Sequence, residues 1–211
     1  GFYDVVALEQ RSISADAISA ASVYAKSKRS ESLLIWHRGK LQYAEYWLGL
    51  GPDDVVNSRS MHKMAGGLLI ARAISDGHIK SLDDSVAEYI PAWQGTDKAS
   101  ITIRNVLQMS SGLRWFSIRD TPPFGLSSRR YLDPEWDKVL LKDVPMSFEP
   151  GTEYDYSDTT ADVMPHIIQG ATGKRYAEYF SEALIQPLDA KGGFVWINRD
   201  GFTLKKGKRN D

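Results

Sequence analysis

Ser60 and Lys63 stand three positions apart at the start of an apolar segment, and they are the first chemical signal in the chain. Residues at i and i+3 lie on nearly the same face of a helix, so the hydroxyl and the amine would project together. A serine hydroxyl becomes a good nucleophile when a neighbour accepts its proton, and a lysine can do this where burial lowers its pKa. Free N–H groups at the helix start would stabilise a developing oxyanion. The spacing therefore predicts a nucleophile with its base.

The same spacing also has an ordinary explanation. About one Ser-x-x-Lys match arises by chance in a chain of this length. Lys63 could equally be a surface lysine at the start of a helix. His62 lies between the two residues and points to another helix face, so we interpret it as a packed or surface histidine.

A second group that could move protons lies far along the chain. Residues 149–163, EPGTEYDYSDTTADV, contain a Pro-Gly turn and then Tyr156 shortly before a helical pattern. A phenol beside an ammonium group could accept or donate a proton during catalysis. Alternatively, Tyr154 and Tyr156 form one face of a short strand and Asp158 is the N-cap. Taken alone, this stretch favours that alternative.

The elements that must position these groups can be predicted from periodicity. Residues 14–28 predict an amphipathic helix, and two β-prone runs, 32–37 and 41–47, predict a hairpin around Arg38-Gly39-Lys40. Residues 60–76 predict a helix that ends at Gly77.

Further helices are predicted at 81–90, 103–109, 161–171 and 176–185, with Thr102 as the cap of the second. Residues 113–143 show no clean period. Long irregular segments in compact domains often form functional walls or lids.

Composition limits the function classes. The chain has 211 residues, 42% hydrophobic and 25% charged, which is typical of one globular domain. A net charge of -1 argues against nucleic acid or acidic membranes as partners. No apolar run is long enough to span a bilayer. With no cysteine, thiolate catalysis and cysteine-ligated metals are excluded, and we expect no metal or cofactor. We expect a soluble protein, either cytoplasmic or exported after removal of a signal.

Three segments together resemble the serine β-lactamase-related family: SMHKMAGGLLIARAISDGHIKSLDDSVAEYIPAW, ITIRNVLQMSSGL and EPGTEYDYSDTTADVMPHIIQGATGKRYAEYFSEALIQPL. The family includes class C β-lactamases, D-alanyl-D-alanine peptidases, esterases and 6-aminohexanoate-dimer hydrolases. The resemblance covers residues 32–188 in the family's order. It implies an α+β fold, in which a helical region accompanies an antiparallel sheet flanked by helices. Residues 1–211 would be one domain, with residues 1–50 in the α/β part and residues 60–188 in the helical part.

The resemblance also implies roles for individual residues. Ser60 would be the acylated nucleophile, Lys63 its proton acceptor, and Tyr156 the group that passes a proton to the leaving group. Asp158 stands where β-lactamases carry an asparagine that contacts substrate. An acid there would repel the carboxylate of a β-lactam. With Trp115, this favours the esterase and 6-aminohexanoate-dimer hydrolase branch, so we predict that Asp158 and Trp115 bind substrate.

Residues 112–130 would form one wall of the substrate pocket, lined by Trp115, Phe116 and Phe124. The alternative is that each of these aromatic residues simply packs in the core or on the surface. The expected reaction is cleavage of a small ester, amide or peptide-like substrate, with penicillin recognition as the nearest alternative.

The sequence departs from the family in one respect. Members continue through further helices and strands, one of which carries a Lys/His-x-Gly motif and a second oxyanion-hole amide, and we expect no counterpart of that strand within these 211 residues. We expect the sequence to be incomplete. Completion by another chain is one alternative. A non-catalytic binding or scaffold remnant is another. The oligomeric state stays open.

Overall fold

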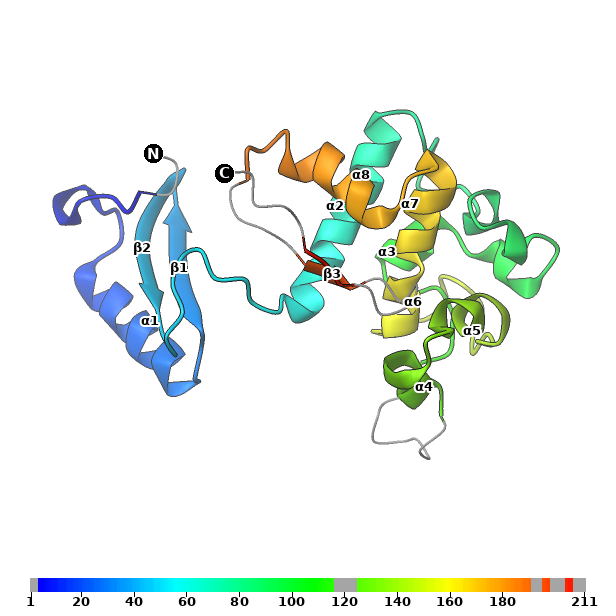
Figure 1. Ribbon diagram of the computed structural model, residues 1–211, viewed down its shortest axis with the longest axis horizontal. Helices are drawn as coiled ribbons and strands as arrows, with labels where there is room; N and C mark the ends of the chain where they lie inside the picture. The colour runs from blue at the N-terminus through cyan, green and yellow to red at the C-terminus, as the bar shows by residue number, and fades with distance from the viewer. Residues whose placement is uncertain (1–3, 116–124, 191–194, 198–203, 207–211) are drawn as a thin grey trace. The chain divides into compact units, whose positions relative to one another are not determined.

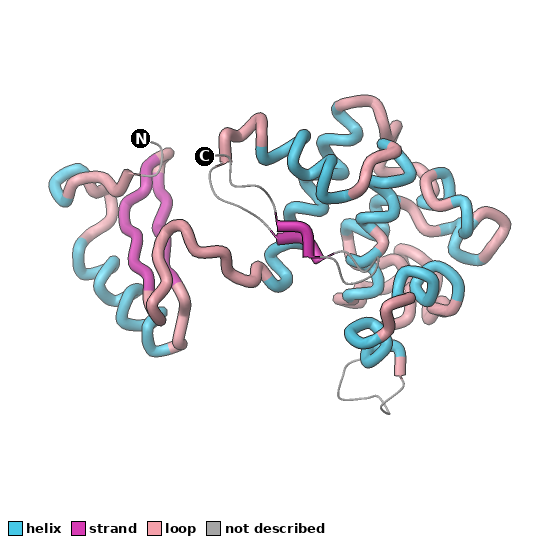
Figure 2. The backbone as a smooth tube through the Cα atoms, viewed as in Figure 1, coloured by secondary structure: helices cyan, strands magenta, loops and turns pink. Residues whose placement is uncertain are grey.

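The computed structural model describes residues 4–115, 125–190, 195–197 and 204–206. The chain forms two compact units, Gly1–Val56 and Asn57–Asp211 (Figure 1). The described part of the second unit is mainly helical, whereas the first combines a helix with a two-stranded sheet (Figure 2). The prediction of one domain with parts at 1–50 and 60–188 stays a prediction.

The first unit contains η1 (Leu8–Gln10), α1 (Ala15–Ser27), β1 (Ser32–His37) and β2 (Lys40–Tyr46). The predicted helix and hairpin are both confirmed, and α1 lies along the hairpin (Figure 1). Ser14 caps α1 by accepting a hydrogen bond from the Ala17 amide. The two loop residues of the hairpin, Arg38 and Gly39, have φ values of 51° and 75°. Positive φ at both positions is the pattern of a type I′ turn, which matches the twist of paired strands.

The described residues of the second unit form 3₁₀, π and α-helical segments and one small strand pair. In chain order these are η2 (Arg59–Met61), α2 (His62–Ser75), η3 (Val86–Glu88), η4 (Pro91–Trp93), η5 (Asp97–Ser100), α3 (Ile103–Leu107), α4 (Leu126–Leu132), α5 (Trp136–Lys142), α6 (Asp158–Asp162), α7 (Met164–Thr172), α8 (Tyr176–Phe180), the π-helical η6 (Ser181–Ile185), β3 (Val195–Ile197) and β4 (Leu204–Lys206). Strands β3 and β4 pair antiparallel, which the sequence did not predict.

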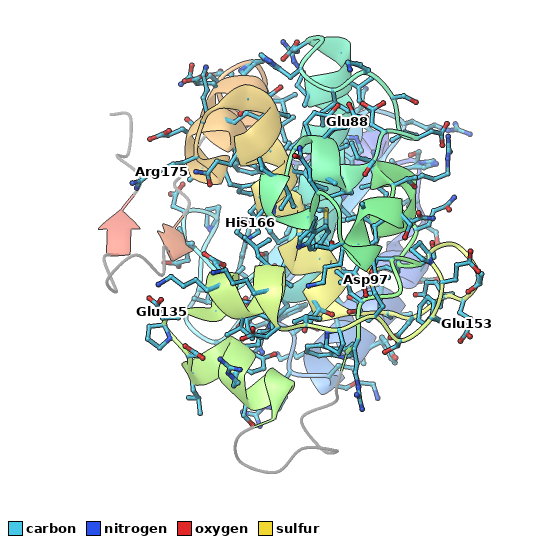
Figure 3. All side chains as sticks on the ribbon, turned by 90° about the vertical axis from the view of Figure 1, so that its right-hand side faces the viewer. Glu88, Asp97, Glu135, Glu153, His166 and Arg175 are labelled. Atoms are coloured by element: carbon cyan, nitrogen blue, oxygen red, sulfur yellow. The ribbon has the colours of Figure 1, made fainter. Side chains whose placement is uncertain are left out.

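Helix α2 is the central element of this unit. Its buried residues Leu69, Ile70 and Ala73 join one hydrophobic cluster to which α3, α5, α7 and α8 also contribute. Gly66 lets α7 approach closely, because a Cβ at this position would stand 2.8 Å from the Met164 sulfur. Exposed acidic residues such as Glu88, Glu135 and Glu153 lie on separate segments of the chain (Figure 3), so negative charge is spread over the unit.

Several predicted boundaries need correction. The helix expected at 81–90 is wrong: Ser85 caps only the 3₁₀ turn η3, and Pro91 opens another. The segment 113–143 is not irregular throughout, because α4 and α5 lie within it. The helix expected at 161–171 is two helices, α6 and α7, and Pro165 occupies the first turn of α7.

Gly170 tests the packing of α7. A Cβ at this position would stand 1.8 Å from the Tyr89 carbonyl oxygen, which is backbone and cannot move freely. We expect Gly170→Ala to lower the free energy of unfolding by about 1–3 kcal/mol or more. Gly67→Ala is the matched control, since its Cβ would meet only Leu107 at 3.8 Å. That change should stabilise α2 by about 0.5–1 kcal/mol. Urea unfolding of both variants checks the pair, and equal effects would contradict the close approach.

His62 provides a second test, through pH. Its ring packs edge-on against Tyr176 at 5.5 Å and near Phe180 at 6.1 Å, so it is packed, as one of the two predictions had it. Burial, with the nearby charge of Lys63, lowers the pKa of His62. The unfolded chain therefore binds a proton more readily than the folded chain. Stability should fall as the pH drops below about 6.5, the pKa of an unperturbed histidine.

When the pH is lowered from about 7.5 to about 5.5, we expect the unfolding free energy of His62→Asn to fall less than that of the parent. His78→Asn serves as the control, because His78 is exposed. Chemical denaturation at the two pH values measures the difference. An unchanged pH dependence in His62→Asn would rule out His62 as its source.

Candidate functional site

Ser60 is presented by a 3₁₀ turn rather than by the first turn of an α-helix. The turn η2 precedes α2, and the Met61 amide donates to the Ser58 carbonyl at 3.0 Å. Arg59 has a φ of 50°, which is the left-handed region, and its amide donates to the Asn57 side chain at 2.8 Å. Left-handed backbone at a residue other than glycine costs about 1–3 kcal/mol and often occurs at functional sites. The prediction that the helix starts at Ser60 is thus corrected by two residues, since α2 begins at His62.

The side chain of Lys63 connects the candidate groups. Its Nζ donates to Ser60 Oγ at 3.2 Å and to Asp158 Oδ1 at 2.6 Å. The same nitrogen lies 5.1 Å from the centre of the Tyr156 ring. Three residues from two distant stretches of sequence, Ser60 in one and Tyr156 and Asp158 in the other, therefore surround one amine. The phenol of Tyr156 is half exposed, and the Ser60 residue is exposed.

The expected direction of the Lys63 pKa is wrong. Burial acts to lower the pKa of Lys63, as the sequence argument assumed. The hydrogen bond and charge of Asp158, with a smaller contribution from the Tyr156 hydroxyl, outweigh burial and raise the pKa above its usual value. Lys63 is therefore an ammonium in the resting site at neutral pH. It can accept a proton only after it has first lost one.

Two chain segments that lie side by side bring Tyr156 and Asp158 to this position. The Gly151 amide donates to the Ser110 carbonyl at 2.8 Å, and the Asp155 amide donates to the Met109 carbonyl at 2.8 Å. Gly112 is essential to this pairing. Its φ is 78°, and a Cβ would stand 2.2 Å from the Phe148 carbonyl oxygen. The Ser-Gly-Leu segment thus supports the tyrosine loop.

Buried hydroxyl groups fix the start of α6. Ser157, and not Asp158 as the sequence alternative had it, is the N-cap, and its hydroxyl accepts from the Thr160 amide at 3.2 Å. Thr160 in turn bonds to the Ser111 hydroxyl at 2.7 Å. Asp158 then stands at the first helical position, where a carboxylate is favourable. These contacts leave its side chain free to reach Lys63.

Sequence reasoning missed a group of residues behind Asp158. Arg130 of α4 forms a two-bond ion pair with Asp162, at 2.7 and 2.9 Å, and its Nη1 lies 3.5 Å from Asp158 Oδ2. The buried Trp136 indole donates to Asp162 at 2.9 Å. Asp158 and Asp162 are four residues apart, so they share one face of α6. The spacing of these two aspartates was the sequence signal that could have identified this group of residues.

Other predictions rest on weaker ground. Trp115 is partly buried, and its part in substrate binding stays a prediction. Phe116 and Phe124 lie outside the described residues.

No helix in the described ranges is both long and apolar enough to cross a bilayer. Within the same ranges, no cluster of three or more His, Asp or Glu side chains is arranged to hold a metal ion.

Comparison with known proteins places the chain in a family. A family model described as Beta-lactamase matches residues 17–202. The 6-aminohexanoate-dimer hydrolase of Paenarthrobacter ureafaciens is 28% identical over 182 residues, which cover 81% of this chain and 46% of that protein. The chain thus spans less than half the length of this relative.

Solved structures agree on the fold. The octameric penicillin-binding protein homologue from Pyrococcus abyssi matches with a TM-score of 0.68 at 17% identity, over 92% of this chain and 50% of that one. A class C beta lactamase matches with a TM-score of 0.65 at 19% identity, over 85% of this chain and 50% of that one. Together with the family match, these similarities confirm the β-lactamase/transpeptidase-like fold. The chain belongs to the Beta-lactamase family.

Proposed function

We propose that this chain carries the acylation site of a serine hydrolase, with Ser60 as the nucleophile toward a small ester or amide. The observation that supports this most directly is the single amine of Lys63, which bonds to the Ser60 hydroxyl and lies beside the Tyr156 ring. A hydroxyl, an amine and a phenol at one point can serve as the nucleophile, the proton acceptor and the proton donor of acyl transfer by serine.

The chemistry follows from these contacts. Ser60 Oγ attacks the substrate carbonyl while its proton passes to the neutral form of Lys63, giving a tetrahedral oxyanion. Collapse of this intermediate breaks the bond to the leaving group, which takes a proton delivered through Tyr156. Water then attacks the acyl-enzyme, releases the acid and returns the proton to Ser60. Proton transfer by positioned groups contributes about 10²–10⁴-fold to rates of this kind.

The class of substrate is part of the proposal. The relative named 6-aminohexanoate-dimer hydrolase favours a small amide, and the esterase alternative uses the same steps. Asp158 was expected to repel a β-lactam carboxylate. Its own charge is, however, compensated by Lys63 at 2.6 Å and Arg130 at 3.5 Å. Repulsion is therefore weaker than the sequence suggested, and nitrocefin turnover tests the penicillin-recognising alternative.

Covalent labelling tests the nucleophile. We expect a fluorophosphonate probe to add to Ser60, because its hydroxyl is exposed and bonded to an amine. Peptide mass mapping locates the adduct. Ser60→Ala should remove labelling and leave the unfolding free energy within about 0.5 kcal/mol of the parent. A probe that reacts elsewhere, or not at all, would favour the non-catalytic binding module.

The phenol has its own test. Tyr156→Phe removes one oxygen and keeps the ring beside Lys63. We expect p-nitrophenyl ester turnover to fall about 10²-fold or more, because one proton-transfer group is lost. Tyr154→Phe is the matched control, since Tyr154 is two residues earlier and 72% exposed. If both variants behave alike, Tyr156 has no part in proton transfer.

A further inference from the structure

Asp158 is placed between two cations. Its Oδ1 accepts from Lys63 Nζ at 2.6 Å, and its Oδ2 lies 3.5 Å from Arg130 Nη1. All three side chains are largely shielded, with relative exposures of 17% for Lys63 and Arg130 and 19% for Asp158. Charges this close and this shielded interact strongly, because little water separates them. The carboxylate that accepts from Lys63 therefore also lies close to the charge of Arg130.

Arg130 is held in place independently of the catalytic groups. Its Nε and Nη2 bond to the two oxygens of Asp162 at 2.7 and 2.9 Å. Trp136, a core residue 1% exposed, donates to the same carboxylate at 2.9 Å. A two-bond arginine–carboxylate pair fixes orientation as well as distance. The third nitrogen of Arg130 is thereby fixed opposite Asp158, although no step of the proposed reaction uses Arg130.

We propose that Arg130 is a positioning residue that sets, through Asp158, the pH range in which Lys63 can accept the proton of Ser60. The proposal rests on the proposed function and adds a regulating residue to the same site. Asp158 holds Lys63 close to Ser60 and also keeps it charged. The positive charge of Arg130 lies beside the same carboxylate. It partly compensates the charge of Asp158, which therefore favours the protonated form of Lys63 less strongly.

The charges of Asp158 and Arg130 shift the pKa of Lys63 in opposite directions. Removing the charge of Asp158 leaves burial as the main influence and should lower the pKa of Lys63. Removing the charge of Arg130 leaves Asp158, and behind it Asp162, less compensated, which should raise the pKa of Lys63 further. A residue with a merely structural role would not give opposite shifts for the two changes.

Among the residues that the structure describes, the other charged and titratable groups near α2 do not offer the same control. On α2 itself His62 is the neighbour of Lys63, and its own pKa is lowered by burial and by that lysine. The ring of Tyr156 lies 5.1 Å from Lys63 Nζ and contributes no carboxylate. On α7, His166 lies 3.5 Å from Asp137, and on η6, Glu182 pairs with Lys174.

The experiment measures how fast a fluorophosphonate adds to Ser60 as a function of pH, by intact mass. The parent should show a rate that rises with pH as Lys63 loses its proton. We expect the midpoint to move up by about one pH unit or more in Arg130→Gln and down by a similar amount in Asp158→Asn. Arg130→Lys, which keeps the charge, should restore much of the parental midpoint.

Arg129→Gln is the matched control. Arg129 is the preceding residue of the same helix, and it pairs with Asp133 at 3.0 Å and Asp143 at 3.8 Å, away from Lys63. This variant removes the same charge and should leave the midpoint unchanged. An equal shift in Arg129→Gln and Arg130→Gln, or no shift in Arg130→Gln, would overturn the proposal.

A second readout separates this inference from the proposed function. Reductive methylation with ¹³C-formaldehyde allows the Lys63 amine to be titrated by NMR, with assignment from its absence in Lys63→Arg. If Ser60 fails to react at any pH, the proposed function fails. The titration of Lys63 still decides the inference. Opposite displacements in Arg130→Gln and Asp158→Asn support it, and an unmoved titration contradicts it.

Discussion

The ion pair between Lys63 and Asp158 is the interaction on which the site depends. It joins the first turn of α2 to the first turn of α6, across 95 positions of sequence, at 2.6 Å. A shielded amine without a partner would be costly, so the pair fixes where the Lys63 side chain must lie. Ser60 and Tyr156 then contact an amine whose position is already set. The close approach of Gly112 to Phe148 and the buried hydroxyl contacts of Ser157 serve the same end.

The pair also creates a conflict within the site. A carboxylate that fixes the amine raises the pKa of Lys63, and a charged Lys63 cannot take the proton of Ser60. A neutral asparagine at this position would orient the amine and stabilise its charge less than a carboxylate does. The aspartate in this chain therefore favours the charged form of Lys63 unless a second positive charge partly compensates it. Arg130, held by Asp162 and Trp136, is placed to supply that charge.

The sequence could predict what depends on local spacing. The hairpin, the cap at Thr102 and the approach of Ser60 to Lys63 all follow from short-range patterns. It could not predict the charge state of Lys63, because that depends on Asp158, a contact set only by folding. Arg130 was missed for the same reason: it lies in a stretch without clean periodicity, and its partners are 28 and 32 residues away. Helix α5 was not predicted, because its buried residues Trp136, Val139 and Leu140 are too few and too interrupted by charged residues to show a clear period.

Trp136 links the core of the helical unit to the amine of Lys63 through Asp162, Arg130 and Asp158. Its ring is buried among core residues such as Val139 and Leu140, while its indole nitrogen bonds to Asp162. Since Asp162 orients Arg130, and Arg130 faces Asp158, packing in the core determines the electrostatics at Lys63. Densely packed interiors respond to small changes in volume, so a core substitution next to Trp136 can alter the chemistry of Ser60 without touching it. Stability and reactivity in this unit are therefore properties of the same contacts.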